Sequence, residues 1–158
     1  MVEVLVVLAI IVVLLAIAIP TLLGARVRAK DRAARSSLRV SLTAAKGIFT
    51  DTNSYFGATA VGLGTAEPAL KFLATASTGP KVIRVLIATA KDTLLSAQSM
   101  SPKCYFVTDS AVYGPAFAVE SGTCAAAVAP AVLSTRPVVG SVAVASAAGI
   151  APTWASTW

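Results

Sequence analysis

The feature that most constrains this chain is an uninterrupted apolar run near its N-terminus. From Val4 to Ile19 there is no polar residue, and the run extends to Leu23 with only Pro20 and Thr21 between. As a helix these twenty residues would be about 30 Å long, which matches the thickness of a bilayer core. The run has no basic stretch before it and no small-residue cleavage site after it, so we expect it to be retained rather than removed as a signal peptide.

The pattern changes after Gly24 without a linker. Residues 25–50 contain no proline, and their apolar side chains recur on one helical face. We therefore predict one helix from about Val2 to Thr50, apolar on all sides in its first half and amphipathic in its second. Pro20 cannot donate a backbone hydrogen bond and crowds the preceding turn, so it is the predicted helix break.

Basic residues are concentrated in the amphipathic half. The chain has 158 residues and a formal net charge of +6, and seven of its 13 Lys and Arg residues lie between Arg26 and Lys46, where Asp31 is the only acidic residue. Phosphates would bind such a surface in a salt-sensitive, sequence-independent way, so weak DNA binding is one interpretation. Contacts between subunits or plain solvation are the favoured interpretation. Five of these residues form a stripe about a quarter-turn from the apolar face: Arg28, Arg32, Arg35, Arg39 and Lys46.

The rest of the chain divides by composition. Residues 51–80 are rich in Gly, Thr, Ser and Pro and are predicted to be a connecting loop, with one helical turn near Pro68 to Ala74. Short β-like runs separated by turn signals then predict an antiparallel meander at 81–89, 93–99, 103–109 and 115–120. The predicted fold class is α+β, with a long N-terminal helix (1–23 apolar, 24–50 amphipathic) packed on an antiparallel sheet (81–124).

The C-terminal extension, residues 125–158, is apolar and carries one charge, Arg136. Its longest clean run, Val138 to Ala151, is too short to cross a bilayer. We expect this extension to supply an extra strand or a strap over neighbouring subunits. Trp154 and Trp158 are interpreted as packing anchors in preference to adhesive aromatics.

Cys104 and Cys124 lie 20 positions apart in the β-like region. Beside an N-terminal membrane segment, a disulfide formed outside the cytoplasm is the favoured interpretation, and two buried free thiols are the alternative. A zinc site would need more ligands than this neighbourhood offers, and the chain has no histidine. We expect no metal, no cofactor and no catalytic site, because a phosphate-binding glycine loop and helix-spaced carboxylate pairs are also missing.

The stretch EVLVVLAIIVVLLAIAIPTLLGARVRAKDRAA resembles the N-terminal helix of type IV pilins and pseudopilins. In that family a glutamate precedes an apolar run that ends at a proline, and an amphipathic helix beginning Gly/Ala-Arg follows. The spacing from Glu3 to Pro20 is similar here. The family usually has two more residues before the glutamate, the first commonly an N-methylated phenylalanine, and often a glycine where Val12 stands.

The resemblance implies a structural protein, the major pilin of an extracellular filament that serves adhesion, motility or DNA uptake. The chain would first span the cytoplasmic membrane once and meet a prepilin peptidase and the pilus assembly machinery. It would then form a helical polymer of identical chains, in which Glu3 docks to a neighbour's N-terminus. The alternatives are a pseudopilin of a type II-like secretion system and a monomeric membrane-anchored extracytoplasmic binding module. For Glu3 alone, the alternative is a preference for the helix N-terminus.

Overall fold

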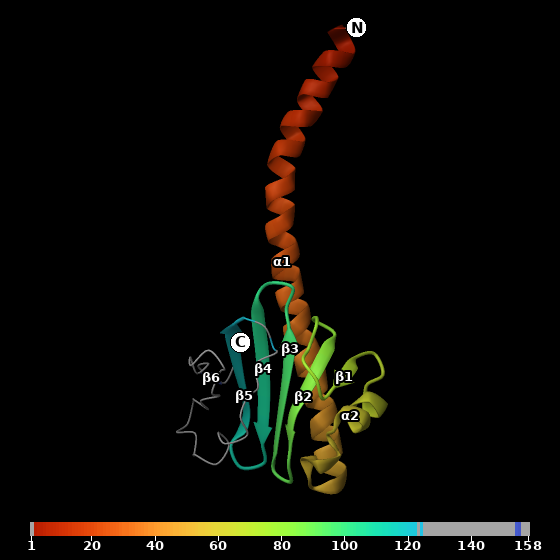
Figure 1. Ribbon diagram of the computed structural model, residues 1–158, viewed down its shortest axis with the longest axis vertical. Helices are drawn as coiled ribbons and strands as arrows, with labels where there is room; N and C mark the ends of the chain where they lie inside the picture. Colours follow the sequence, from red (N-terminus) through yellow and green to blue (C-terminus); the bar gives the residue numbers. More distant parts are fainter. Residues whose placement is uncertain (1, 123, 125–153, 156–158) are drawn as a thin grey trace.

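The computed structural model describes residues 2–122, 124 and 154–155. One six-stranded sheet, in the order β1-β2-β3-β4-β5-β6, lies against the C-terminal half of a long helix, while the N-terminal half of that helix projects away (Figure 1). The fold is therefore α+β, as predicted. The elements in chain order are α1 (Val2–Thr52), η1 (Tyr55–Gly57), α2 (Ala60–Ala66), β1 (Lys71–Leu73), β2 (Val82–Ala88), β3 (Asp92–Gln98), β4 (Lys103–Ser110), β5 (Gly114–Ser121) and β6 (Trp154–Ala155).

The amphipathic half of α1 packs on the sheet along one face. Its buried side chains follow helical spacing and contact a single cluster on β2, β3 and β4 that includes Ile83, Leu95 and Val107. The helix ends before Asn53, whose φ of 51° lies in the left-handed region that asparagine tolerates better than most residues. The buried helical positions are Ala34, Leu38, Leu42 and Ala45.

The two faces of the sheet carry alternating side chains, because successive residues of a strand point to opposite sides. On β4, Tyr105 and Val107 belong to the cluster under α1. Cys104 and Phe106 belong to a second cluster, which also contains Cys124. The central strands β3 and β4 are therefore buried on both faces, and the disulfide lies on the face away from α1.

The four strands predicted from alternation are present as β2, β3, β4 and β5, each within a residue or two of its expected bounds. They form the predicted antiparallel meander. The loop expected at 51–80 is more structured than predicted. It contains η1, α2 and β1, and α2 is N-capped by Thr59, whose hydroxyl accepts a hydrogen bond from the Gly62 backbone at 3.2 Å.

The helical turn predicted near Pro68 to Ala74 was wrong, because Lys71–Leu73 pair in parallel with β2. Long-range pairing decides the conformation of so short a segment, and three residues are too few to show an alternating pattern. In the C-terminal extension, residues 154–155 add a strand beside β5, which agrees with one of the two expectations for it. The expectations for residues 125–153 and for Trp158 lie outside the described residues.

Candidate assembly surface

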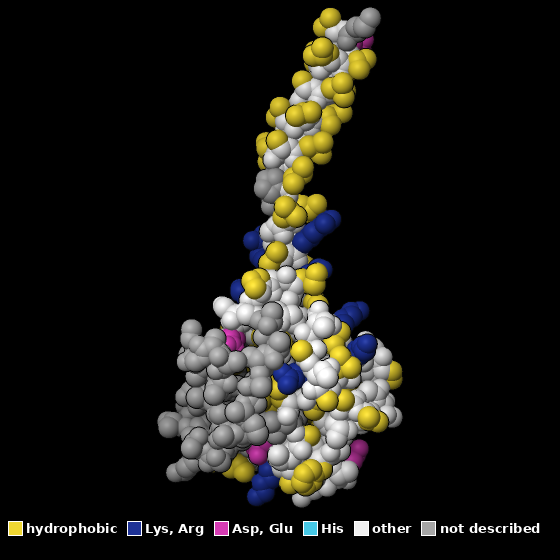
Figure 2. All heavy atoms as spheres, viewed as in Figure 1, with side chains coloured by type: hydrophobic (Ala, Val, Ile, Leu, Met, Phe, Trp, Pro, Cys, Tyr) yellow, Lys and Arg dark blue, Asp and Glu magenta, His cyan; other side chains and the backbone are white. Residues whose placement is uncertain are grey.

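The N-terminal part of α1 exposes its apolar side chains on every side. We call Val2–Leu23 the projecting segment; its described side chains are all exposed, and the large apolar ones are 46 to 78% accessible. The segment is long and apolar enough to cross a membrane, and none of it is buried within the chain (Figure 2). Exposed apolar surface of this extent marks a site of association with a membrane or with other chains.

Two of the predicted site residues lie on the projecting segment. Glu3 is in the first turn of α1, at the exposed tip, where a carboxylate also complements the partial positive charge of a helix N-terminus. Around Pro20 the backbone is helical in the single chain, and α1 is continuous from Val2 to Thr52. The helix break predicted at Pro20 is therefore not present in the single chain, and an interruption that forms on assembly into a filament stays a prediction.

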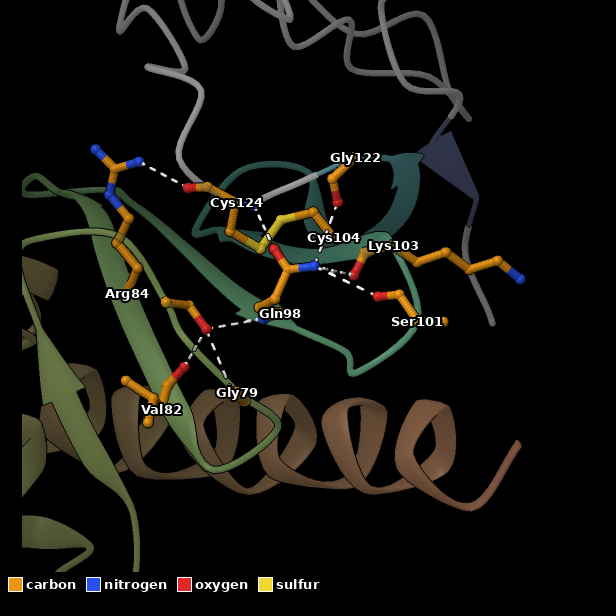
Figure 3. Close-up of a disulfide and its surroundings, with 10 residues drawn as sticks. Gly79, Val82, Arg84, Gln98, Ser101, Lys103, Cys104, Gly122 and Cys124 are labelled. Atoms are coloured by element: carbon orange, nitrogen blue, oxygen red, sulfur yellow. Dashed lines mark hydrogen bonds between the residues drawn. A yellow bond between two sulfur atoms is a disulfide. The ribbon is translucent and has the colours of Figure 1, made fainter. Parts of the chain in front are cut away.

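Cys104 and Cys124 form the predicted disulfide, which joins the start of β4 to the chain that follows β5. Gln98 lies beside it at the end of β3 (Figure 3). The side-chain amide nitrogen of Gln98 donates to the Gly122 carbonyl at 3.3 Å, and its oxygen accepts from the Cys124 backbone at 2.5 Å. Arg84 donates to the Cys124 carbonyl at 3.1 Å. The point where the C-terminal extension leaves the sheet is therefore fixed by one covalent bond and two side chains.

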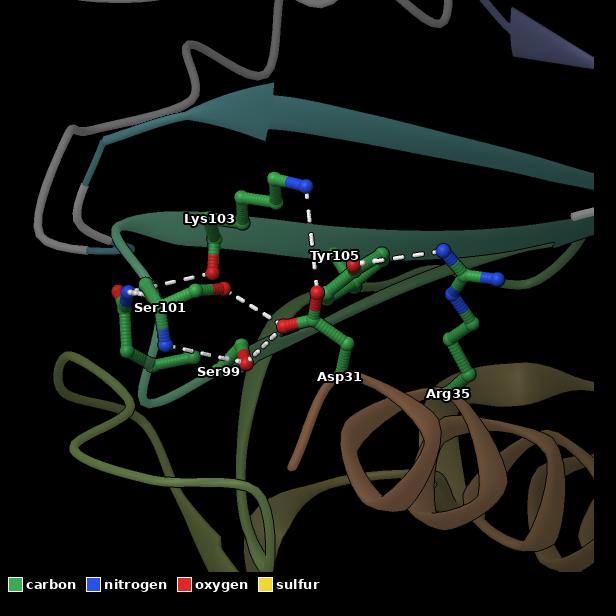
Figure 4. A network of polar contacts seen from close by, with 7 residues as sticks. Asp31, Arg35, Ser99, Ser101, Lys103 and Tyr105 are labelled. Carbon is green, nitrogen blue, oxygen red and sulfur yellow. Dashed lines mark hydrogen bonds and ion pairs between the residues drawn. The ribbon is translucent and has the colours of Figure 1, made fainter. Parts of the chain in front are cut away.

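Near the projecting segment, Asp31 anchors α1 to the turn between β3 and β4 (Figure 4). The Oδ1 atom of Asp31 accepts a hydrogen bond from Ser101 at 2.6 Å and another from Ser99. The Oδ2 atom lies 3.9 Å from the ammonium group of Lys103. We call this network the Asp31 anchor. It ties the helix to the sheet just beyond the point where the projecting segment ends.

The surroundings of Asp31 favour its ionised form. Burial by itself would raise its pKa, since the side chain is only 13% exposed. Hydrogen bonds from Ser101 and Ser99, together with the charge of Lys103, outweigh burial and hold the pKa below its ordinary value. The carboxylate is therefore a stable ionic partner of the β3–β4 turn at neutral pH.

At the other end of the amphipathic half, Asp109 of β4 also connects α1 to the sheet. Its Oδ2 atom accepts a hydrogen bond from the Tyr55 hydroxyl, and its Oδ1 atom lies 3.6 Å from the Lys46 ammonium group. The Tyr55 ring stacks on Phe49 of α1, with 4.6 Å between ring centroids. Burial, the hydrogen bond to Asp109 and the nearby negative charges raise the pKa of Tyr55. We call this group the Asp109 anchor.

The residues of the predicted basic stripe differ in their contacts with the sheet. Lys46 belongs to the Asp109 anchor, and the guanidinium group of Arg35 lies 5.0 Å from the Tyr105 ring centroid and donates to its hydroxyl at 3.4 Å. Arg28, Arg32 and Arg39 are exposed. The stripe is thus divided between residues that fix the helix to the sheet and residues available for an external partner.

Sequence reasoning did not predict the anchors, although one signal was present. Asp31 precedes Ala34 by three positions and Leu38 by seven, so it lies on the buried face of the helix, where an acidic residue needs partners. Those partners are about 70 positions away and have no local signature. For Asp109, the sequence shows only that it lies near the end of an apolar strand, which does not identify its partners.

No protein-family profile, curated protein or solved structure matches this chain. The resemblance to pilins therefore rests on the residues quoted above, and the fold adds a pilin-like arrangement of helix and sheet.

Proposed function

We propose that this chain is a structural subunit, the major pilin of a type IV pilus, that polymerises through α1 into an extracellular filament. The observation that carries the proposal is the projecting segment, which leaves its apolar side chains exposed all round. A bilayer before assembly and a bundle of identical helices after assembly would each remove this surface from water. Burying a single large aliphatic side chain contributes about 1.5–3 kcal/mol, so the drive to associate is large.

Glu3 supports the proposal because of where it lies. An ionised carboxylate within hydrocarbon costs about 2.5–3.5 kcal/mol on insertion scales unless it finds a partner. In a bundle of parallel helices, the α-amino group of a neighbouring chain is the cationic group at a similar depth. Pairing with it would favour one axial offset between subunits, which is what a regular filament requires.

The anchors favour a filament over a tethered binding module. We call the sheet and the part of α1 that packs on it the head. A tethered module works with a flexible linker between membrane and domain, but α1 continues from the projecting segment into the head without one. Asp31 and Lys46, which are about 22 Å apart along the helix axis, each bond to the sheet. A helical polymer needs every subunit to present its head at the same angle, and these contacts supply that rigidity.

Electron microscopy of material sheared from cells that express this chain tests the proposal. Long filaments whose major protein is this chain by mass spectrometry would support it. Short periplasmic assemblies, together with loss of protein secretion when the chain is deleted, would instead indicate a pseudopilin. A chain that stays monomeric in the membrane under all growth conditions would contradict assembly altogether.

A further inference from the structure

Four basic side chains surround α1 just after the projecting segment. We call residues 24–32 the neck; Figure 2 shows Lys and Arg side chains around the helix at this level. All four are exposed, and none forms an ion pair with the residues that the structure describes. Asp31, the acidic residue of the neck, is already occupied by Ser99, Ser101 and Lys103. The neck therefore presents uncompensated positive charge from Arg26, Arg28, Lys30 and Arg32.

The first two of these charges, Arg26 and Arg28, lie at about the depth of the headgroup layer of a bilayer. Hydrocarbon-compatible sequence ends at Leu23, and a helix rises about 1.5 Å per residue, so Arg26, Arg28 and Lys30 follow at about 4.5, 7.5 and 10.5 Å. Headgroups occupy roughly 5–7 Å on each side of the hydrocarbon. Lys30 and Arg32 begin beyond this layer, but helical side chains lean toward the N-terminus, which brings their charged ends back toward it. Arg28 does so here, because its Nη2 atom lies 4.0 Å from the position of a Cβ added to Gly24.

The β3–β4 turn adds an apolar side chain at the same level. Ser99 and Ser101 both bond to Asp31, so the turn is held against the neck. Met100 lies between them and is 60% exposed. Counted along the helix, Asp31 lies about 12 Å beyond Leu23, so this apolar tip flanked by cations faces the outer side of the headgroup layer. There basic side chains can meet phosphates, and a tilt of α1 would bring the methionine into contact with lipid.

We propose that the neck and the Met100 turn form a docking surface for the anionic phospholipid headgroups of the bilayer that α1 spans. The inference depends on the membrane insertion included in the proposed function, and it does not depend on filament formation. Each basic residue near an anionic surface strengthens the attraction roughly fivefold. Docking would hold the head against the membrane at one depth and one tilt. Duplex DNA, the competing polyanion, would bind the same charges but offers no apolar layer in which Met100 could be buried.

The test uses the full chain with an environment-sensitive dye on Met100→Cys. The dye attaches selectively, because the two native cysteines are joined to each other. The labelled chain is placed in vesicles of phosphatidylcholine alone and in vesicles with about a third phosphatidylglycerol, an anionic lipid. Resistance to alkaline extraction reports insertion, and the blue shift of dye emission reports contact of the turn with lipid.

Three variants on the labelled background separate charge from other effects. Arg26→Gln with Arg28→Gln removes two neck charges, and Arg26→Lys with Arg28→Lys keeps them. Lys91→Gln removes one exposed charge at the β2–β3 turn, at the opposite end of β3. We expect insertion in every case, and a blue shift that requires phosphatidylglycerol. The glutamine variant should need severalfold more anionic lipid for the same shift, while the lysine and Lys91 variants behave like the parent.

Added salt should weaken the shift, since the screening length falls below about 8 Å above physiological ionic strength.

Normal insertion with emission that does not depend on phosphatidylglycerol, or on the neck arginines, would overturn this inference and leave the proposed function intact. Failure of the chain to insert would contradict both. If the glutamine variant instead lost binding to a DNA duplex in detergent, with no effect in vesicles, the neck would be a DNA-binding surface and the lipid assignment would be wrong.

Discussion

Ser101 donates a hydrogen bond to Asp31 across 2.6 Å, joining two residues that are 70 positions apart. This contact connects the tip of the β3–β4 turn to α1 at the point where the helix leaves the head. The contact therefore fixes the position of the sheet relative to α1 close to the C-terminal end of the projecting segment.

The Asp31 anchor predicts a loss of stability on neutralisation. Asp31→Asn should lower the free energy of unfolding by about 1–3 kcal/mol, because hydrogen bonds to a charged acceptor are replaced by weaker ones and the Lys103 pairing is lost. Denaturant unfolding of the full chain in detergent measures this. Asp51→Asn is the matched control, since Asp51 is exposed near the end of the same helix.

The same variant should also change the response to acid. The pKa of Asp31 is lowered in the folded chain, so its stabilisation is fully present above the ordinary value of 3.8 and is lost as the pH falls through the folded pKa. Between about pH 5 and pH 2 the parent should therefore lose more stability than Asp31→Asn. Equal losses in the two proteins would show that the anchor is not ionic.

At the Asp109 anchor, Tyr55→Phe should cost about 1–2 kcal/mol, because a buried carboxylate oxygen loses its donor. The raised pKa of Tyr55 means that the folded chain holds this phenolic proton when the unfolded chain has released it. Stability should thus fall as the pH rises above about 10, and less so in the variant. Tyr113→Phe, at a residue that is 55% exposed, should match the parent; a similar loss there would contradict a specific role for Tyr55.

Removal of the disulfide should loosen the sheet without affecting α1. The pair Cys104→Ser and Cys124→Ser should lower the free energy of unfolding by about 3 kcal/mol, the chain-entropy value for a loop of this size. Unfolding curves measure the loss, and extraction of the chain from membranes should be unchanged. Mass spectrometry without reduction provides the complementary check, where a link between two chains would contradict the intramolecular bond.

The parts of the fold that sequence could predict are those with a local period. The alternation at 103–109 and the helical spacing of Leu38, Leu42 and Ala45 each identify an element and its buried face. The anchors and β1 could not be predicted in this way. Asp31, Asp109 and the short segment Lys71–Leu73 acquire their roles from partners elsewhere in the chain, and only the packing of the sheet on α1 brings those partners together.

Pro20 predicts a difference between the single chain and the filament. It cannot supply a backbone hydrogen bond, and in a filament neighbouring helices can satisfy the carbonyl groups upstream. We expect α1 to be interrupted or extended over a few residues between about Leu14 and Leu23 after assembly, with Val12 keeping the upstream limit close to Pro20. Extended backbone rises about 3.3 Å per residue against about 1.5 Å in a helix, so the filament could stretch there. A filament map with unbroken helical bonding from Val4 through Leu38 would contradict this.

Filament yield from Glu3 variants shows whether Glu3 docks one subunit to the next. Glu3→Leu and Glu3→Ala remove the carboxylate and keep the apolar surface that drives membrane insertion. Glu67→Gln, on the head, controls for the loss of one acidic residue. We expect normal amounts of each chain in the membrane. Filaments counted by electron microscopy should be abundant for the parent and Glu67→Gln but absent or severely reduced for both Glu3 variants. Normal filament numbers from either Glu3 variant would contradict docking through Glu3.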